Sequence, residues 1–168
     1  MATPLGHSIV GYTVARLAGV NSRRSMMLSV AAASLPDVDF LMGLVANGDP
    51  RSLHREAITH KRVFPLLVGA ATGVAATAWA LLRGHRPTAR EVLRPAALAT
   101  ALVGSHVIMD PLPLPYDSTS DLWGTSGQIV AGQAWNAVID LAVYGGLAMA
   151  ILRENGPADV APDAWLTN

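Results

Sequence analysis

The stretch VFPLLVGAATGVAATAWALL, residues 63–82, decides the fold class because it runs for twenty residues without a charged side chain. A helix of about twenty apolar residues is long enough to cross the hydrocarbon core of a bilayer. Of the whole chain, 51% is hydrophobic and only 14% is charged, which is more apolar than a typical soluble domain. The stretch therefore predicts a membrane-spanning helix in an integral-membrane protein.

Other apolar stretches flank this helix and predict an all-α bundle of about four to five helices. They are residues 7–20, 26–35, 95–109 and 137–152. The first two are short, so we expect them to span by tilting or thinning the bilayer, or to lie buried among the other helices. The 168-residue length predicts one domain, residues 1–152, followed by a flexible tail, residues 153–168.

Turns between these stretches would make neighbouring helices antiparallel. We expect chain reversals near residues 21–24 and 83–94, and a surface loop over residues 46–55. Pro36 disfavours helical geometry at the residue before it, so the second helix should end at Ser34 or Leu35.

Histidine and aspartate side chains recur at the ends of the apolar stretches. In an antiparallel bundle all of these positions fall at one end, where several segments would deliver imidazoles and carboxylates to one plane. The pattern predicts a metal site at that end, built from His7, Asp37, Asp39, His54, His60, His106 and Asp110.

The strongest local motif is His106-x-x-x-Asp110, because residues four apart share a helix face and can bind one ion together. Alone, such a pair is more often an ordinary hydrogen-bonded pair. Late in an apolar helix it is costly unless it is partnered, and ionisable residues in membranes are commonly functional. The chain has no cysteine, so imidazole and carboxylate are the available ligands. We expect a divalent metal, zinc first, with manganese or iron compatible.

The residues around Pro36 and before the long helix have alternative roles. Asp37 could cap a short helix beginning at Val38 or bind the metal, whereas ligation is favoured for Asp39. His54 and His60 are six residues apart and would point to different sides of a helix. We favour His60 as the ligand, with Thr59 as a helix cap and His54 facing the substrate or supporting a ligand.

Three further polar residues could have structural or solvent-exposed roles instead of roles at the metal site. His7 could be a surface histidine, and His85, in the basic turn at the other end, is expected to be solvated. An unpaired carboxylate inside the last apolar stretch would be expensive, so Asp140 should have a partner. It could pair with an arginine or steady a ligand histidine, and we favour the second role.

Most basic residues fall at the bundle end opposite the histidines and aspartates. The positive-inside rule then makes that end cytoplasmic and places the cluster on the outer, periplasmic face. The first fifteen residues have no lysine or arginine, so no secretory signal is predicted and the first helix should be retained. No dense basic stripe with interleaved aromatics is present, which argues against nucleic acid as a partner.

The ordered set of His7, LPDVD at residues 35–39, HREAITH at 54–60 and HVIMD at 106–110 resembles the YdjM-like family of inner-membrane metal-dependent hydrolases, some of which are LexA-regulated. The resemblance covers residues 5–145. It implies a multi-pass protein of the cell inner (plasma) membrane with hydrolase activity.

A more distant similarity is to zinc-dependent phospholipase C and the P1-type nucleases, helical enzymes that hydrolyse phosphoesters. It implies that Asp39, His60, His106 and Asp110 hold one metal, and that His7 and a bridging Asp110 hold a second. Those soluble enzymes use further histidine and glutamate ligands downstream, whereas no histidine follows His106 here. We therefore expect one or two metals.

Together these patterns predict a membrane-bound hydrolase acting on a phosphoester, such as a lipid headgroup or another amphiphilic small molecule. A divalent ion would lower the pKa of a bound water and polarise the scissile group. Asp37 or Glu56 would relay the proton, while Arg55, Lys61 or Arg62 would hold an anionic substrate.

Two other classes of protein compete with this hypothesis. One is a non-enzymatic metal-binding membrane protein, either a sensor or a transporter component. Transport calls for ionisable groups along a path through the bilayer, whereas here they gather at one end with Asp140 as the main exception. The other is a structural membrane module whose histidines and aspartates only pair with one another.

Overall fold

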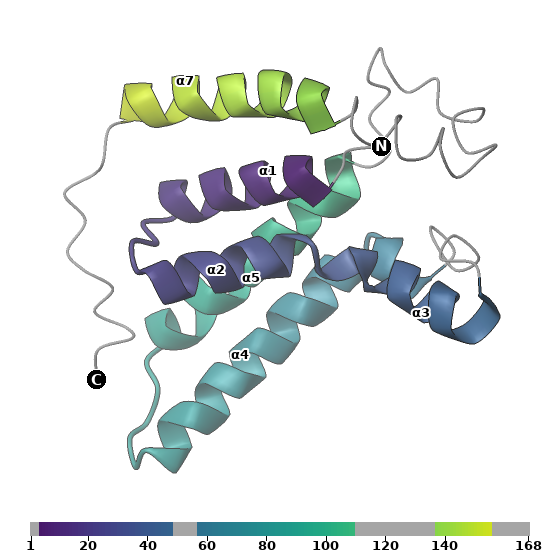
Figure 1. Cartoon of the computed structure of the whole chain (residues 1–168). Helices are drawn as coiled ribbons and strands as arrows, with labels where there is room; N and C mark the ends of the chain where they lie inside the picture. The colour runs from purple at the N-terminus through teal and green to yellow at the C-terminus, as the bar shows by residue number, and fades with distance from the viewer. Residues whose placement is uncertain (1–3, 49–56, 110–136, 156–168) are drawn as a thin grey trace.

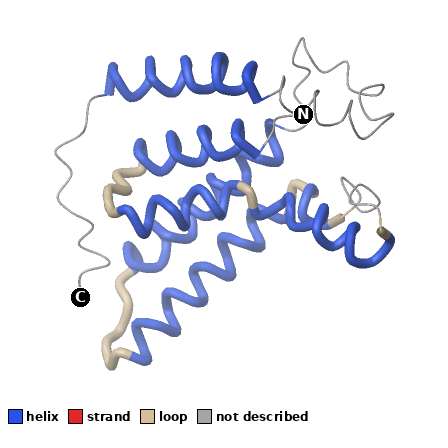
Figure 2. The backbone as a smooth tube through the Cα atoms, viewed as in Figure 1, coloured by secondary structure: helices blue, strands red, loops and turns tan. Residues whose placement is uncertain are grey.

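The computed structural model describes residues 4–48, 57–109 and 137–155, and within these ranges the chain is helical and has no strand (Figures 1 and 2). The main helices are α1 (Pro4–Leu17), α2 (Arg23–Ala33), α3 (Val38–Asn47), α4 (Phe64–Leu82), α5 (Ala89–Met109) and α7 (Gly146–Asn155). Short helical turns are η1 (Leu35–Asp37), η2 (Ile58–His60) and η3 (Leu141–Gly145), the last a π-helical turn between residues 137–140 and α7. The predicted all-α bundle is confirmed.

Helices α4 and α5 are both long and apolar enough to cross a membrane, with 19 and 21 residues. The first confirms the span predicted at residues 63–82. The second begins at Ala89, six residues before the expected start at Pro95, so the turn between the two helices is shorter than predicted. The cause is a capping box, in which the Thr88 hydroxyl accepts from the Glu91 N–H (3.3 Å) and the Glu91 carboxylate accepts from the Thr88 N–H (2.7 Å).

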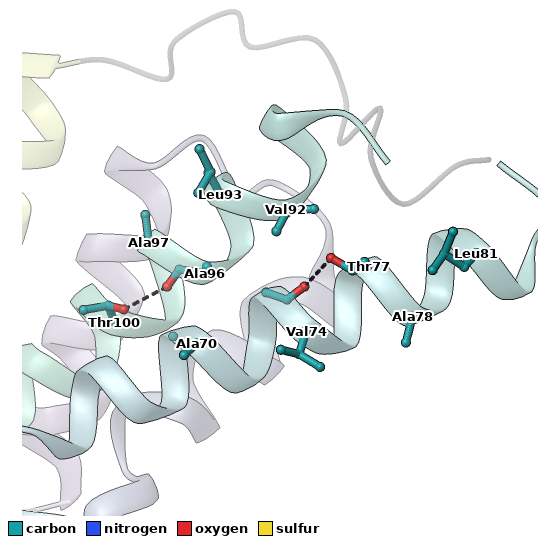
Figure 3. Close-up of a pocket in the computed structure, with 12 residues that line it drawn as sticks. Ala70, Val74, Thr77, Ala78, Leu81, Val92, Leu93, Ala96, Ala97 and Thr100 are labelled. Carbon is teal, nitrogen blue, oxygen red and sulfur yellow. Dashed lines mark hydrogen bonds between the residues drawn. The ribbon is translucent and has the colours of Figure 1, made fainter. Parts of the chain in front are cut away.

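Small residues allow α4 and α5 to pack closely along their length. A Cβ atom on Gly69 would overlap the Thr100 hydroxyl, and one on Gly73 would lie 3.6 Å from the Ala96 Cβ. The hydroxyls of Thr77 and Thr100 donate to carbonyls one turn back, at 2.9 and 3.0 Å, and leave an apolar groove between the helices (Figure 3). Such close approach is typical of helix pairs in membranes.

Helix α2 runs antiparallel to α1 and ends where the sequence predicts a break. The two helices approach closely at Gly11, where an added Cβ would lie 2.5 Å from the Ala33 Cβ. The last helical residue is Ala33, one position before the expected end, and Pro36 lies in the short turn η1 that follows. Helices α2 and α3 meet at a bend of 54°, and together they are long and apolar enough for one broken span or a re-entrant segment.

The last helix lies beside α1 (Figure 1). Tyr144, in the π-helical turn, packs with Met109 of α5 and with Ile9 and Val10 of α1. Helix α7 continues to Asn155, and the remainder of the predicted tail lies outside the described residues.

The ends of the helices gather into two groups. The beginning of α1, the end of α2 and the end of α5 lie together at one side, while the α1–α2 and α4–α5 turns lie at the other (Figure 1). Arg94 at the start of α5 joins the second group, because its guanidinium donates to the Ala18 carbonyl at 3.0 Å. This arrangement is the antiparallel one expected from the sequence.

Candidate metal centre

Side chains from three separate segments bring possible metal-ligand atoms together at one end of the bundle. They are His7 in α1, Asp37 in η1 and His106 in the last turn of α5, and their ligand atoms lie within 4.8 Å of one another. Both histidines are buried, at 2% and 0% exposed, whereas the Asp37 side chain is 21% exposed. The group therefore has a closed side formed by the imidazoles and an open side marked by the carboxylate.

His106 is fixed in orientation by a backbone carbonyl. Its Nδ1 lies 2.8 Å from the Ala33 oxygen at the end of α2. Because a carbonyl only accepts, Nδ1 must carry the proton, and Nε2 is the nitrogen left with a lone pair in the neutral ring. Such an anchor on the far nitrogen is what metal-binding histidines usually have.

The lone-pair nitrogen of His106 faces a carboxylate. The distance from Nε2 to the Asp37 Oδ1 is 3.4 Å. Two acceptors this close in a buried site need a cation between them, either a proton or a metal ion. The separation is close to the roughly 3.3 Å expected between two ligand atoms of one tetrahedral zinc ion.

His7 completes the group by stacking on His106. The two ring centroids are 3.6 Å apart and the planes differ by 13°. The His7 Nδ1 atom is buried from solvent. The stack thus brings two imidazoles, the side chains that most often bind metal ions, together at the site.

A second His/Asp pair lies beside this group. His60 Nδ1 is 2.7 Å from the Asp39 Oδ2, and the Thr59 hydroxyl donates to the same oxygen at 2.9 Å. The His60 ring meets His106 edge-on, with centroids 5.3 Å apart. The predicted role of Thr59 as a helix cap is wrong, because Ala57 holds the capping position of η2 and the Thr59 hydroxyl is bound to Asp39.

The bend after Pro36 separates the roles of the two aspartates. Asp37 holds the capping position of α3 but makes no side-chain capping hydrogen bond, and its carboxylate faces His106. Asp39 lies in the first turn of α3, is fully buried, and faces His60. The Asp37 side chain thus makes no cap and lies at the candidate metal site, where it could bind the ion or accept a proton.

Asp140 is fully buried, one helical turn before Tyr144. Tyr144 packs beside Ile9 and Met109, which are two and three residues from His7 and His106 respectively. Asp140 thus lies in the helical segment that covers this end of α1, and the supporting role favoured from the sequence stays a prediction. His54, Arg55, Glu56 and Asp110, also predicted for the site, lie outside the described residues.

Two polar groups of the site could not be assigned from the sequence. The Ala33 carbonyl carries no signal, because every residue has one. The Thr59 hydroxyl has a weak signal, since a hydroxyl next to a candidate ligand such as His60 is a common supporting donor. Both became visible only when the packing of α2 and η2 was known.

The residues present fit a divalent metal. Two imidazole nitrogens and one carboxylate oxygen, with an open side, form the donor set that catalytic zinc sites use, and manganese or iron is compatible with it. The site also has the anchored imidazole that such ions require.

Comparison with known proteins identifies the family. The family described as "YdjM inner membrane protein" matches residues 1–158, nearly the whole chain. No curated protein and no solved structure matched the chain, so the similarity to phospholipase C and P1 nuclease stays a prediction. The two membrane-length helices agree with the family description, and the chain is a membrane protein. It belongs to the YdjM inner membrane protein family.

Proposed function

We propose that this protein is a membrane-bound, metal-dependent hydrolase that cleaves a phosphoester of an amphiphilic substrate. The observation that carries the proposal is the group formed by buried His7 and His106 with the partly exposed Asp37, whose ligand atoms three segments bring within 4.8 Å. Buried histidine and aspartate are expensive in an apolar protein, and they recur where chemistry needs them.

The chain's own residues supply binding, orientation and proton transfer. A divalent metal, when bound, would polarise the phosphoester and lower the pKa of the attacking water. Water attacks phosphorus, the ester P–O bond breaks, and the departing alkoxide takes up a proton. Asp37, at the open side, accepts the proton that the water loses, and the proposed second carrier is Glu56. Exposed Lys61 and Arg62, directly after His60, would hold the anionic group.

The position of the site favours a lipid-like substrate. His106 lies three residues before the end of α5, and His60 lies four residues before the start of α4. Because the two membrane-length helices are antiparallel, both histidines lie at the same end of the helix pair. Groups at the ends of such helices lie at the depth of lipid headgroups. A phosphoester in a headgroup would reach Asp37 without leaving the membrane.

We further propose that the site faces the outer side of the membrane. Eight arginines lie at the opposite end of the bundle or just beyond it, and the positive-inside rule makes that end cytoplasmic. They are Arg16, Arg23, Arg24, Arg83, Arg86, Arg90, Arg94 and Arg153.

Single cysteines test this orientation, since the chain has none of its own. Arg86→Cys and Lys61→Cys place thiols at exposed positions on the two ends. An impermeant maleimide added to intact cells should label position 61 and spare position 86. The reverse pattern would contradict the proposed orientation.

The activity is tested with purified full-length protein in lipid or detergent, loaded with zinc or manganese. Wild type should hydrolyse at least one substrate in a panel of phospholipids and model phosphodiesters. Asp37→Asn should lower the rate by about two to four orders of magnitude, the usual scale for a lost acid/base group. The matched control is Glu91→Gln, an exposed carboxylate at the other end of α5.

Two outcomes would change the assignment. Metal-loaded wild type that hydrolyses nothing in the panel favours the non-enzymatic alternative, a membrane sensor or transporter component. If Asp37→Asn loses metal together with activity, Asp37 is a ligand and proton transfer passes to Glu56.

A further inference from the structure

We propose that Asp39 is a positioning residue, which holds His60 so that its Nε2 faces the metal centre, and that Asp39 is not itself a metal ligand. This inference rests on the proposed metal centre. It departs from the expectation drawn from family resemblance, in which Asp39 binds the ion directly.

One carboxylate oxygen of Asp39 accepts two hydrogen bonds. Asp39 Oδ2 lies 2.7 Å from His60 Nδ1 and 2.9 Å from the Thr59 hydroxyl, which donates to it. A carboxylate accepts, so His60 carries a proton on Nδ1, and in the neutral ring the lone pair is then on Nε2. The Oδ2 atom is thus already used by two donors, while the buried Nε2 is the ring's metal-binding atom.

The two histidines His60 and His106 are held in the same way. His106 is also held through Nδ1, by the Ala33 carbonyl, and its Nε2 faces Asp37. Asp39 accepts the Nδ1 hydrogen bond of His60, as the Ala33 carbonyl accepts that of His106. The two rings, whose centroids are 5.3 Å apart, therefore both donate a hydrogen bond from Nδ1. In the neutral form each ring has its lone pair on Nε2.

The two aspartates face different histidines, Asp37 facing His106 and Asp39 facing His60. The group of mutually close donor atoms found among the described residues contains Asp37, whereas Asp39 and His60 form a separate pair beside it. Asp39 is fully buried, and Thr59 and His60 are nearly so, at 7% and 5% exposed. Two donors offset part of the cost of burying this carboxylate, and they join the first turn of α3 to η2, the turn that precedes α4.

The test compares three variants of the full-length protein in detergent. Asp39→Asn keeps the size of the side chain and removes its charge. Thr59→Val removes the hydroxyl that donates to Asp39, whereas Thr59→Ser retains a hydroxyl. Zinc affinity is measured by competition with a chromophoric chelator. We expect Asp39→Asn to weaken zinc binding about 10- to 100-fold, as loss of a supporting partner does. Thr59→Val should weaken it less, and Thr59→Ser should bind as wild type does.

Cobalt substitution separates positioning from ligation. At saturating cobalt, Asp39→Asn should keep the wild-type stoichiometry and visible spectrum, because the ligands are unchanged. His106→Ala should alter both. If the spectrum of Asp39→Asn changes as that of His106→Ala does, Asp39 is a ligand. If Asp39→Asn and Thr59→Val both bind zinc with wild-type affinity, the positioning role is refuted.

A metal-free measurement keeps this inference distinct from the proposed function. Long-range proton–nitrogen NMR of the metal-free protein should show His60 with its proton on Nδ1, and Asp39→Asn should shift that equilibrium. A wild-type His60 with its proton on Nε2 would overturn the inference even if zinc binds. Wild-type protein that binds no metal would instead refute the metal centre.

Discussion

The two ends of α5 hold similar side chains in opposite surroundings. At its start, His85 lies 3.5 Å from Glu91, and the two side chains are 50% and 46% exposed. At its end, His106 is fully buried, bonded to the Ala33 carbonyl and facing Asp37. Each end therefore has a histidine beside a carboxylate, and only one end excludes water.

Burial is what gives the second pair chemical meaning. Water screens the exposed pair, so it contributes little and can be replaced freely. At the buried end each nitrogen and oxygen needs a defined partner, because an unsatisfied group there is costly. That requirement fixes the form of His106 and leaves a lone pair opposite a carboxylate.

The largest expected effect tests this contrast directly. His106→Ala should remove most of the tightly bound divalent metal from the purified protein, because it deletes the anchored donor of the group. His85→Ala, the matched control, should leave metal content unchanged. Elemental analysis after dialysis measures both. Equal metal content in the two variants would show that the buried end is not the metal site.

In the middle of the α4–α5 pair, a larger side chain should lower the stability of the protein because the helices pack closely there. Gly69→Val places a side chain where even a Cβ overlaps the Thr100 hydroxyl. We expect about 1–3 kcal/mol of destabilisation, the usual cost of overpacking. Gly146→Ala is the control, because no described atom lies within 4 Å of its added Cβ.

Unfolding in mixed detergent micelles, followed by circular dichroism, measures the stability of both glycine variants. Similar stability of Gly69→Val and wild type would mean that α4 and α5 can separate at this level. The buried end of α5 would then be held mainly by its contacts with α1, α2 and η1.

Much of the fold follows from the sequence because its signals are local. The uncharged run at residues 63–82 predicts α4 to within one residue, and Pro36 predicts the end of α2. The start of α5 was predicted six residues late because the apolar stretch begins only at Pro95, whereas the capping box at Thr88 begins the helix in the charged segment before it. Pro95 lies inside α5, where it removes one backbone hydrogen bond, and helices in membranes tolerate such a proline because neighbouring groups compensate for the loss.

The site was predictable only in part, because its contacts are long-range. Histidines and aspartates at helix ends predicted that His7 and His106 would meet. The sequence could not show that Asp37 faces His106 while Asp39 faces His60, since that division depends on the 54° bend between α2 and α3. Residues two apart leave a helix in different directions, so a small change in the bend decides which partner each one meets.

A smaller effect is expected from the cap at the exposed end. Thr88→Ala removes the hydroxyl that accepts from the Glu91 N–H, and should cost about 1 kcal/mol of stability. Thr88→Ser should retain the cap. Metal content should be the same in both, since the change lies at the end of α5 away from His106. Loss of metal in Thr88→Ala alone would show that the two ends are coupled through the helix.

The smallest effect should come from His85→Ala, which removes the exposed pair. Its ring and the Glu91 carboxylate are half exposed and 3.5 Å apart, so water and salt screen their attraction. The turn itself does not depend on the ring, because the His85 N–H bonds to the Ala80 carbonyl at 3.2 Å and Gly84 supplies the left-handed residue, with φ of 78°. Thermal unfolding of His85→Ala at low and high salt should match wild type. A loss as large as that of Thr88→Ala would mean that the exposed histidine holds the α4–α5 turn together, and that solvent exposure alone does not distinguish the two ends of α5.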